Sequence, residues 1–166
     1  LALIAFTVPM FHGPMRRARL LVFLHPWESA DDKAYQILQS LSSVALGGWT
    51  GVGLGNGTAK WFVPVVYSDF VFAVIAEELG FLGCAVVIGC YLLFGVLGFR
   101  AAMCAPDRFG TLLAVGLTLT VLVQATINIG MVVGILPVSG LTLPFVSYGG
   151  TSLVSMLAAA GVLQNI

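Results

Sequence analysis

Charged residues are scarce in this chain: Asp, Glu, Lys and Arg make up 8% of its 166 residues. Seven basic side chains balance seven acidic ones, so the sequence offers neither a basic surface for nucleic acid nor an acidic tail. With 59% hydrophobic residues and a mean hydropathy of +1.04, the composition does not fit a soluble domain. The composition therefore predicts a membrane protein that does not bind nucleic acid.

Cysteine and metal-ligand patterns are equally sparse. Cys84, Cys90 and Cys104 form no Cys-x-x-Cys pair and cannot all be joined in disulfides, so we interpret them as small apolar packing residues. His12 and His25 stand apart from each other and from any carboxylate at metal-ligand spacing. The sequence thus predicts no metal site.

Uncharged runs, in contrast, are long. A helix needs about 20 residues to cross the hydrocarbon core of a bilayer, and we expect transmembrane helices at 70–99, 109–136 and 145–166. Residues 1–11 are interpreted as the end of a further transmembrane helix. The chain is therefore expected to be a fragment of an all-α polytopic membrane protein, with residues 1–166 in a single integral-membrane domain.

Residues 12–68 form a polar stretch that is too long for a tight connection between helices. Because lipid does not tolerate unpaired backbone, this loop must lie outside the membrane or against protein. Within it, residues 34–46 have the apolar spacing of a short amphipathic helix near the membrane surface. The following "GGWTGVGLGNG" (47–57) contains six glycines and indicates a flexible or tightly turned strip.

Two parts of this loop are candidates for binding an anion. The spacing after the glycines is wrong for a Walker loop, which leaves a looser hypothesis of backbone N–H groups and Lys60 near a diphosphate. The cluster of Arg16, Arg17 and Arg19 would by default meet anionic lipid headgroups, and a site for a lipid-linked diphosphate is the sharper alternative. Charge counting does not decide on which side of the membrane the loop lies.

The stretch "VPVVYSDF" (63–70) places one carboxylate, Asp69, where the loop enters a membrane-length run. Either Ser68 or Asp69 caps the next helix, an effect of about 1 kcal/mol, or Asp69 is a functional group. The residues alone favour the cap. Glu77 and Glu78 follow about two helical turns later, and we expect one of them to pair with an arginine inside the bundle, because carboxylates at that depth are costly unless paired.

Prolines and glycines interrupt the apolar stretch "GILPVSGLTLPFVSYGGTS" (134–152). Irregular backbone at membrane depth is tolerated only where it lines a cavity or is buried in protein. This stretch is therefore a candidate site, and Ser147, Gly149 and Gly150 are its candidate substrate-binding residues.

The run before this stretch carries two further patterns. Gln124 and Asn128, at i and i+4, share one helical face and are expected to form hydrogen bonds inside the bundle. Gly130 and Gly134 form a Gly-x-x-x-Gly pattern, which predicts close packing of two helices.

Two blocks of the chain, 23–83 and 124–153, resemble the SEDS membrane glycosyltransferases (shape, elongation, division and sporulation proteins), which include FtsW, RodA and SpoVE. The blocks follow the family's order and cover well over half of the chain, and "GLTLPF" (140–145) leans towards FtsW. The resemblance implies the C-terminal part of a ten-helix bundle in the bacterial cytoplasmic membrane, with 12–68 as its large extracytoplasmic loop. It also implies an inverting peptidoglycan glycosyltransferase that polymerises undecaprenyl-diphosphate-linked lipid II together with a class B penicillin-binding protein.

The family's loop motif, Leu-Pro-Glu-x-His-Thr-Asp-Phe, has its essential carboxylate at the position of Asp69, which the resemblance makes the candidate general base. Val65 and Tyr67 replace the usual Glu and His. A divalent cation bridging the diphosphate is chemically compatible with this reaction, but no ligand cluster indicates one. The candidate substrate-binding residues are Arg16, Arg17, Arg19, Lys60, Gln124, Asn128, Ser147, Gly149 and Gly150.

Two other functions fit the sequence. A transporter of lipid-linked precursors would also use many helices and a broken, Pro/Gly-rich segment. A weakly active scaffold for a penicillin-binding protein is suggested by the departures at Val65 and Tyr67.

Overall fold

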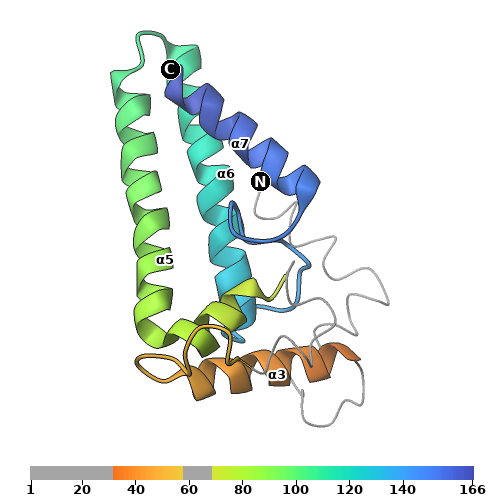
Figure 1. Cartoon of the computed structure of the whole chain (residues 1–166). Helices are drawn as coiled ribbons and strands as arrows, with labels where there is room; N and C mark the ends of the chain where they lie inside the picture. Colours follow the sequence, from red (N-terminus) through yellow and green to blue (C-terminus); the bar gives the residue numbers. More distant parts are fainter. Residues whose placement is uncertain (1–31, 58–68) are drawn as a thin grey trace.

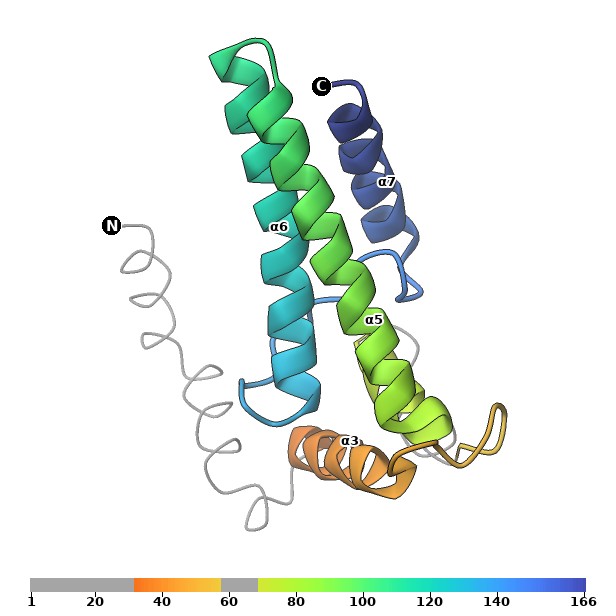
Figure 2. The same ribbon diagram turned by 90° about the vertical axis from the view of Figure 1, so that its left-hand side faces the viewer.

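The computed structural model describes residues 32–57 and 69–166, and the regular structure within them is helical. Four helices are present: α3 (Asp32–Gly47), α5 (Val71–Cys104), α6 (Arg108–Val132) and α7 (Gly150–Gln164). Helices α5 and α6 stand side by side, and α3 lies across one end of this pair (Figures 1 and 2). The helix end expected at 1–11 and the cationic residues Arg16, Arg17, Arg19 and Lys60 lie outside the described residues.

Helices α5 and α6, with 34 and 25 residues, are long and apolar enough to cross a membrane. Their most apolar windows have mean hydropathies of 2.3 and 1.9, yet only 11% and 28% of the residues in those windows are buried inside the structure. Helices that expose apolar side chains on most faces are stable in lipid or against further protein, not in water. The shorter helix α7 is also apolar and packs on α6.

The helix ends differ from the expected ones for local reasons. Helix α5 continues beyond residue 99 to Cys104 and stops at Ala105, whose extended conformation is the one favoured before Pro106. Helix α6 ends at Val132, four residues before the expected end, since Gly134 adopts a φ of 76° just beyond it. Helix α7 begins at Gly150 and not at 145, since residues 145–149 are irregular.

Helix α5 is broken at Gly80, whose φ of 64° and ψ of −159° are not helical. The break separates a short arm, residues 71–79, from the long membrane-spanning part (Figure 1). The glycine strip (47–57) pairs with the backbone groups that the break frees: Val52 N–H donates to Glu77 O at 2.9 Å, and Phe81 N–H donates to Gly48 O at 2.9 Å. The strip is therefore tightly turned, as one of the two sequence interpretations had it.

The approach of the strip to the arm depends on glycine. A Cβ added to Gly51 would lie 2.1 Å from Glu78 O, and one added to Gly80 would lie 2.4 Å from Gly51 N. Distances below 3.0 Å are not compatible with a real Cβ, so two backbones here occupy space that side chains normally fill. Steric exclusion of a Cβ thus explains why several positions of the strip are glycine.

The Gly-x-x-x-Gly prediction of close helix packing is right only for Gly134, which lies against helix α3: a Cβ there would be 3.2 Å from Leu41 Cδ2. Gly134 lies outside α6 in a left-handed turn, and Gly130 is nearest to Leu136 of the same turn. Close helix packing is also found between α5 and α6, where Gly98 lies against Thr118 and Gly95 against Leu122. The pattern belongs to the end of α6, where a glycine at positive φ lets the chain reverse.

Candidate active site

Asp69 precedes α5 and is half-buried. Phe70, at the N-cap position, is 2% exposed, and the N-terminus of α5 has no side-chain cap hydrogen bond. The prediction that Asp69 caps this helix is therefore wrong, whereas Ser68, the other predicted cap, lies outside the described residues. The fully buried Phe70 fixes the start of the helix by packing. The Asp69 carboxylate is not used as a cap.

The backbone of Asp69 is fixed by a side chain of α6. The Asn128 side chain is fully buried, and its Nδ2 donates to Asp69 O at 2.8 Å and to Leu141 O at 2.6 Å. This one amide joins the start of α5 to the irregular stretch after α6. Among the described residues no donor reaches Asn128 Oδ1, although this atom is buried. Buried amide oxygens usually accept a hydrogen bond, so Asn128 Oδ1 is an exception within the described residues.

Gln124 extends the same arrangement by one helical turn. Its Nε2 donates to Thr142 O at 2.9 Å, next in the chain to the carbonyl that Asn128 holds. The expectation that the two amides share a face and form hydrogen bonds inside the bundle is confirmed. Together they supply donors to backbone carbonyls that no helix or sheet satisfies.

The irregular stretch 133–149 turns back from the end of α6 towards the middle of the bundle, where α7 starts (Figures 1 and 2). Gly140, with a φ of 71°, brings this stretch to the carboxylate: a Cβ at Gly140 would lie 3.8 Å from Asp69 Oδ2. Further along, Ser147 Oγ accepts from Leu143 N–H at 2.8 Å. The broken stretch is thus buried only in part, at Leu143, Pro144 and Ser147, while Ile135 and Tyr148 are exposed, and side chains stabilise its backbone.

The other residues predicted at this site lie farther along the stretch. Ser147 is 7% exposed, and its hydroxyl closes the turn from Leu143. Gly149 is the N-cap residue of α7, and Gly150, which is exposed, is the first residue of that helix. The structure brings Asn128 and Gln124 together and places Asn128 against Asp69; Ser147, Gly149 and Gly150 instead form the turn into α7.

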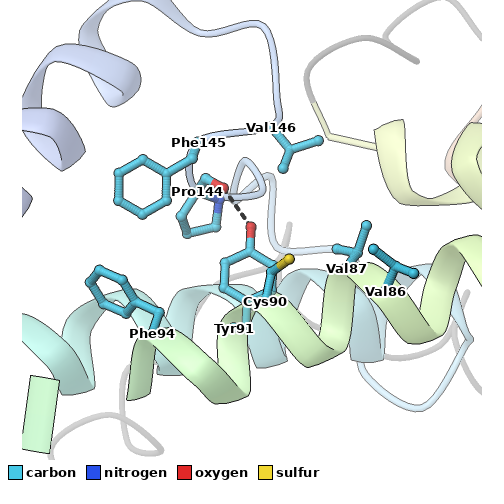
Figure 3. Close-up of a pocket in the computed structure, with 8 residues that line it drawn as sticks. All are labelled: Val86, Val87, Cys90, Tyr91, Phe94, Pro144, Phe145 and Val146. Carbon is cyan, nitrogen blue, oxygen red and sulfur yellow. Dashed lines mark hydrogen bonds between the residues drawn. The ribbon is translucent and has the colours of Figure 1, made fainter. Parts of the chain in front are cut away.

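Sequence reasoning missed Tyr91 and Phe145. Tyr91 is buried, and its hydroxyl donates to Pro144 O of the broken stretch (Figure 3). Phe145 has a φ of 63°, the one positive φ of a non-glycine residue in the described parts of the chain. A tyrosine within an otherwise apolar run was the available signal for the first, because a buried phenol needs a partner. Nothing in the sequence marks the backbone of Phe145.

Glu77 lies in the short arm of α5 and is 2% exposed. A Cβ at Gly57 would lie 3.0 Å from Glu78 Oε1 and 3.4 Å from Glu77 Oε2, so the last glycine of the strip lies against both carboxylates. The expected pairing of one of them with an arginine stays a prediction. Within residues 32–57 and 69–166, no three His, Cys, Asp or Glu side chains gather into a group suited to a metal ion.

Comparison with known proteins decides the family. The sequence profile of the FtsW, RodA and SpoVE family, described as cell cycle proteins, matches residues 1–166. The chain belongs to this family. Stage V sporulation protein E of Bacillus subtilis is 45% identical over 170 residues, covering 100% of this chain and 46% of the relative. A probable peptidoglycan glycosyltransferase FtsW of Geobacter metallireducens is 40% identical over 172 residues, with the same shares.

A solved structure supports the same assignment. One chain of a peptidoglycan synthase complex, described in terms of the coordination of polymerization and crosslinking, superposes with a TM-score of 0.74 at 31% identity. The match covers 96% of this chain and 45% of that one. This FtsW/RodA/SpoVE family member is thus a membrane protein whose described regular structure is helical, and its chain spans about half the length of the relatives it matches.

Proposed function

We propose that this chain is the C-terminal part of a peptidoglycan glycosyltransferase that polymerises lipid II into glycan strands. The observation that carries the proposal is the placement of Asp69, half-buried at the start of a membrane-length helix and fixed through its backbone by Asn128. Relatives named as probable peptidoglycan glycosyltransferases support it, as does the structural similarity to a chain of a peptidoglycan synthase complex.

In this reaction Asp69 acts as general base. A sugar hydroxyl of the acceptor attacks the anomeric carbon of the donor, the bond from that carbon to the diphosphate oxygen breaks, and the hydroxyl proton passes to a carboxylate oxygen of Asp69. The electron pair of the broken bond leaves with the diphosphate. Arg16, Arg17, Arg19 and Lys60 are the cations proposed to stabilise that charge.

In this proposal Asn128 is a positioning residue, whereas the sequence alone makes it a candidate ligand of the substrate. Both of its amide hydrogens are directed at backbone carbonyls, and the side chain is fully buried. It sets the distance between Asp69 and the stretch around Gly140, and errors of about 1 Å in such geometry can cost about a hundredfold in rate.

The rest of the protein is proposed from the family. The described helices fit the last part of a ten-helix bundle in the bacterial cytoplasmic membrane, with 12–68 as an extracytoplasmic loop. A class B penicillin-binding protein is the proposed partner, because the matched complex is one of polymerization and crosslinking. No step of this mechanism passes through a metal ion.

The experiment that tests this function is polymerisation of lipid II by the full-length protein with its penicillin-binding partner, resolved on gels. We expect Asp69→Asn to abolish strand formation at equal protein level. The matched control is Asp107→Asn: Asp107 is an exposed acid that caps α6 at the other end of the α5–α6 pair, and its loss should leave polymerisation unchanged. Full activity of Asp69→Asn would overturn the role of the base, and translocation of lipid II without strands would favour the transporter.

A further inference from the structure

A groove of about 320 Å³ lies between the middle of α5 and the turn 144–146 (Figure 3). Its walls come from the 86–94 face of α5 and from Pro144, Phe145 and Val146. The polar atom of Tyr91 does not face an occupant, because its hydroxyl donates to Pro144 O. The groove therefore presents hydrocarbon and one thiol, that of Cys90, and suits an apolar ligand.

One wall of the groove is built at a conformational cost. Phe145 has a φ of 63°, in a region that residues with a Cβ disfavour, and its ring packs against Phe94 with centroids 5.9 Å apart. Glycine would adopt this backbone without strain. The strain therefore comes from placing a phenylalanine, and not a glycine, at this position. Strained residues of this kind cluster at active sites and ligand clamps. In Figure 3 both rings stand at one end of the groove.

One short segment of the chain joins the groove to the carboxylate site. Residues 140–146 form one short segment: at one end Gly140 lies near Asp69 Oδ2 and Leu141 O accepts from Asn128, and at the other end 144–146 line the groove. A molecule with its head group at Asp69 and a hydrocarbon chain along this segment would contact both. One wall of the groove belongs to α5, which is long and apolar enough to cross a membrane. A hydrocarbon chain in the groove would therefore lie at membrane depth.

We propose that this groove binds the hydrocarbon chain of the lipid-borne substrate whose head group reaches Asp69. The proposal rests on the proposed glycosyltransferase function and adds to it the path of the lipid. The groove holds part of a long chain next to its diphosphate end, and the rest of the chain extends into the bilayer. Phe94 and Phe145 close one end, which sets the direction in which the chain leaves the site.

Cys90 provides a direct test, because it is an exposed free thiol in the groove wall, and Cys104, also exposed, lies at the far end of the same helix. The full-length protein, with Cys84→Ala and any cysteine outside this chain replaced by alanine, is placed in nanodiscs and labelled with a membrane-soluble maleimide. Undecaprenyl diphosphate at ten times its dissociation constant should slow labelling of Cys90 about tenfold by mass action. Labelling of Cys104 should not change.

Four results would overturn the proposal: unchanged labelling of Cys90, equal protection by added phospholipid, equal protection by the soluble sugar nucleotide that lacks the lipid chain, or a Cys90 that is unreactive without lipid while Cys104 reacts. The last would show that protein covers the groove. The readout does not depend on catalysis, so Asp69→Asn should keep the protection. Loss of polymerisation in Asp69→Asn without protection of Cys90 would leave the function standing and reject the groove.

A second pair of variants tests the groove through kinetics. Val86→Trp fills the groove from an exposed position, and Val96→Trp adds the same bulk on α5 at a similarly exposed position outside it. Val86→Trp should raise KM about tenfold for the full-length lipid substrate and much less for a short-chain analogue, whereas Val96→Trp should change neither. Equal effects of the two variants, or equal effects on both substrates, would contradict the proposal.

Discussion

Two interruptions of helical structure within the described residues, at Gly80 and at 133–149, are stabilised in different ways. At Gly80 the freed backbone groups of α5 pair with the backbone of the glycine strip. In the stretch 133–149 the carbonyls of Leu141 and Thr142 are instead held by the side chains of Asn128 and Gln124. Each break must satisfy backbone groups that an intact helix would satisfy itself.

This difference has a consequence for what each region tolerates. Backbone-to-backbone pairing at Gly80 requires the absence of side chains, because two chains approach more closely than a Cβ allows. Pairing through amide side chains requires particular residues, and it leaves polar groups near the carboxylate. The first break sets the angle of the arm that follows Asp69, and the second places the stretch that faces it.

The largest effect is expected at the glycine break. Gly80→Ala places a Cβ 2.4 Å from Gly51 N and forces a φ of 64° on alanine, so strain and overpacking together should cost at least about 2 kcal/mol. We expect a lower midpoint of thermal unfolding in detergent and little folded protein. The control is Gly89→Ala on the same helix, where a Cβ meets nothing within 4 Å and should stabilise by about 0.5–1 kcal/mol. Similar melting of both variants would contradict the steric role of the strip.

The amide at Asn128 should be the next most sensitive position. Asn128→Ala leaves the buried carbonyls of Asp69 and Leu141 without their donor, at a cost of about 1–3 kcal/mol. Because Asn128 positions the base without touching substrate, kcat should fall and KM for lipid II should change little. Gln124→Ala is the comparison, since Gln124 is only partly buried and holds the neighbouring carbonyl. A KM effect larger than the kcat effect would indicate that Asn128 binds the substrate and would contradict its positioning role.

The sequence sufficed for the features that depend on local pattern. Uncharged length predicted the membrane helices, apolar spacing predicted the helix that is now α3, and the i, i+4 amides were expected to form the hydrogen bonds that they form. It failed where distant contacts override a local rule. Asp69 is not a cap, because the burial of Phe70 fixes the start of α5. The kink at Gly80 depends on a strip more than 20 residues away, which no local pattern encodes.

A smaller effect is expected at the wall of the groove. Tyr91→Phe removes the hydroxyl that donates to Pro144 O and leaves the ring in place. The loss of one buried hydrogen bond should lower the free energy of unfolding by about 0.5–1.5 kcal/mol. Thermal unfolding of the full-length protein measures this. Phe94→Leu is a useful control because it disturbs the ring pair with Phe145 but no hydrogen bond, and it should not loosen the 144–146 turn to the same extent.

The smallest effect separates the two ends of the broken stretch. Gly150 begins α7, is exposed, and a Cβ there meets nothing within 4 Å, so Gly150→Ala should change stability by no more than about 0.5 kcal/mol. Gly140→Ala, by contrast, places a side chain at a φ of 71° beside Asp69 and should be costlier. Polymerisation by Gly150→Ala at the wild-type rate would show that the predicted substrate contact at Gly150 lies too far along the stretch. A large loss of rate with unchanged melting would instead show that substrate reaches Gly150, and would extend the site from the end held by Asn128 to the start of α7.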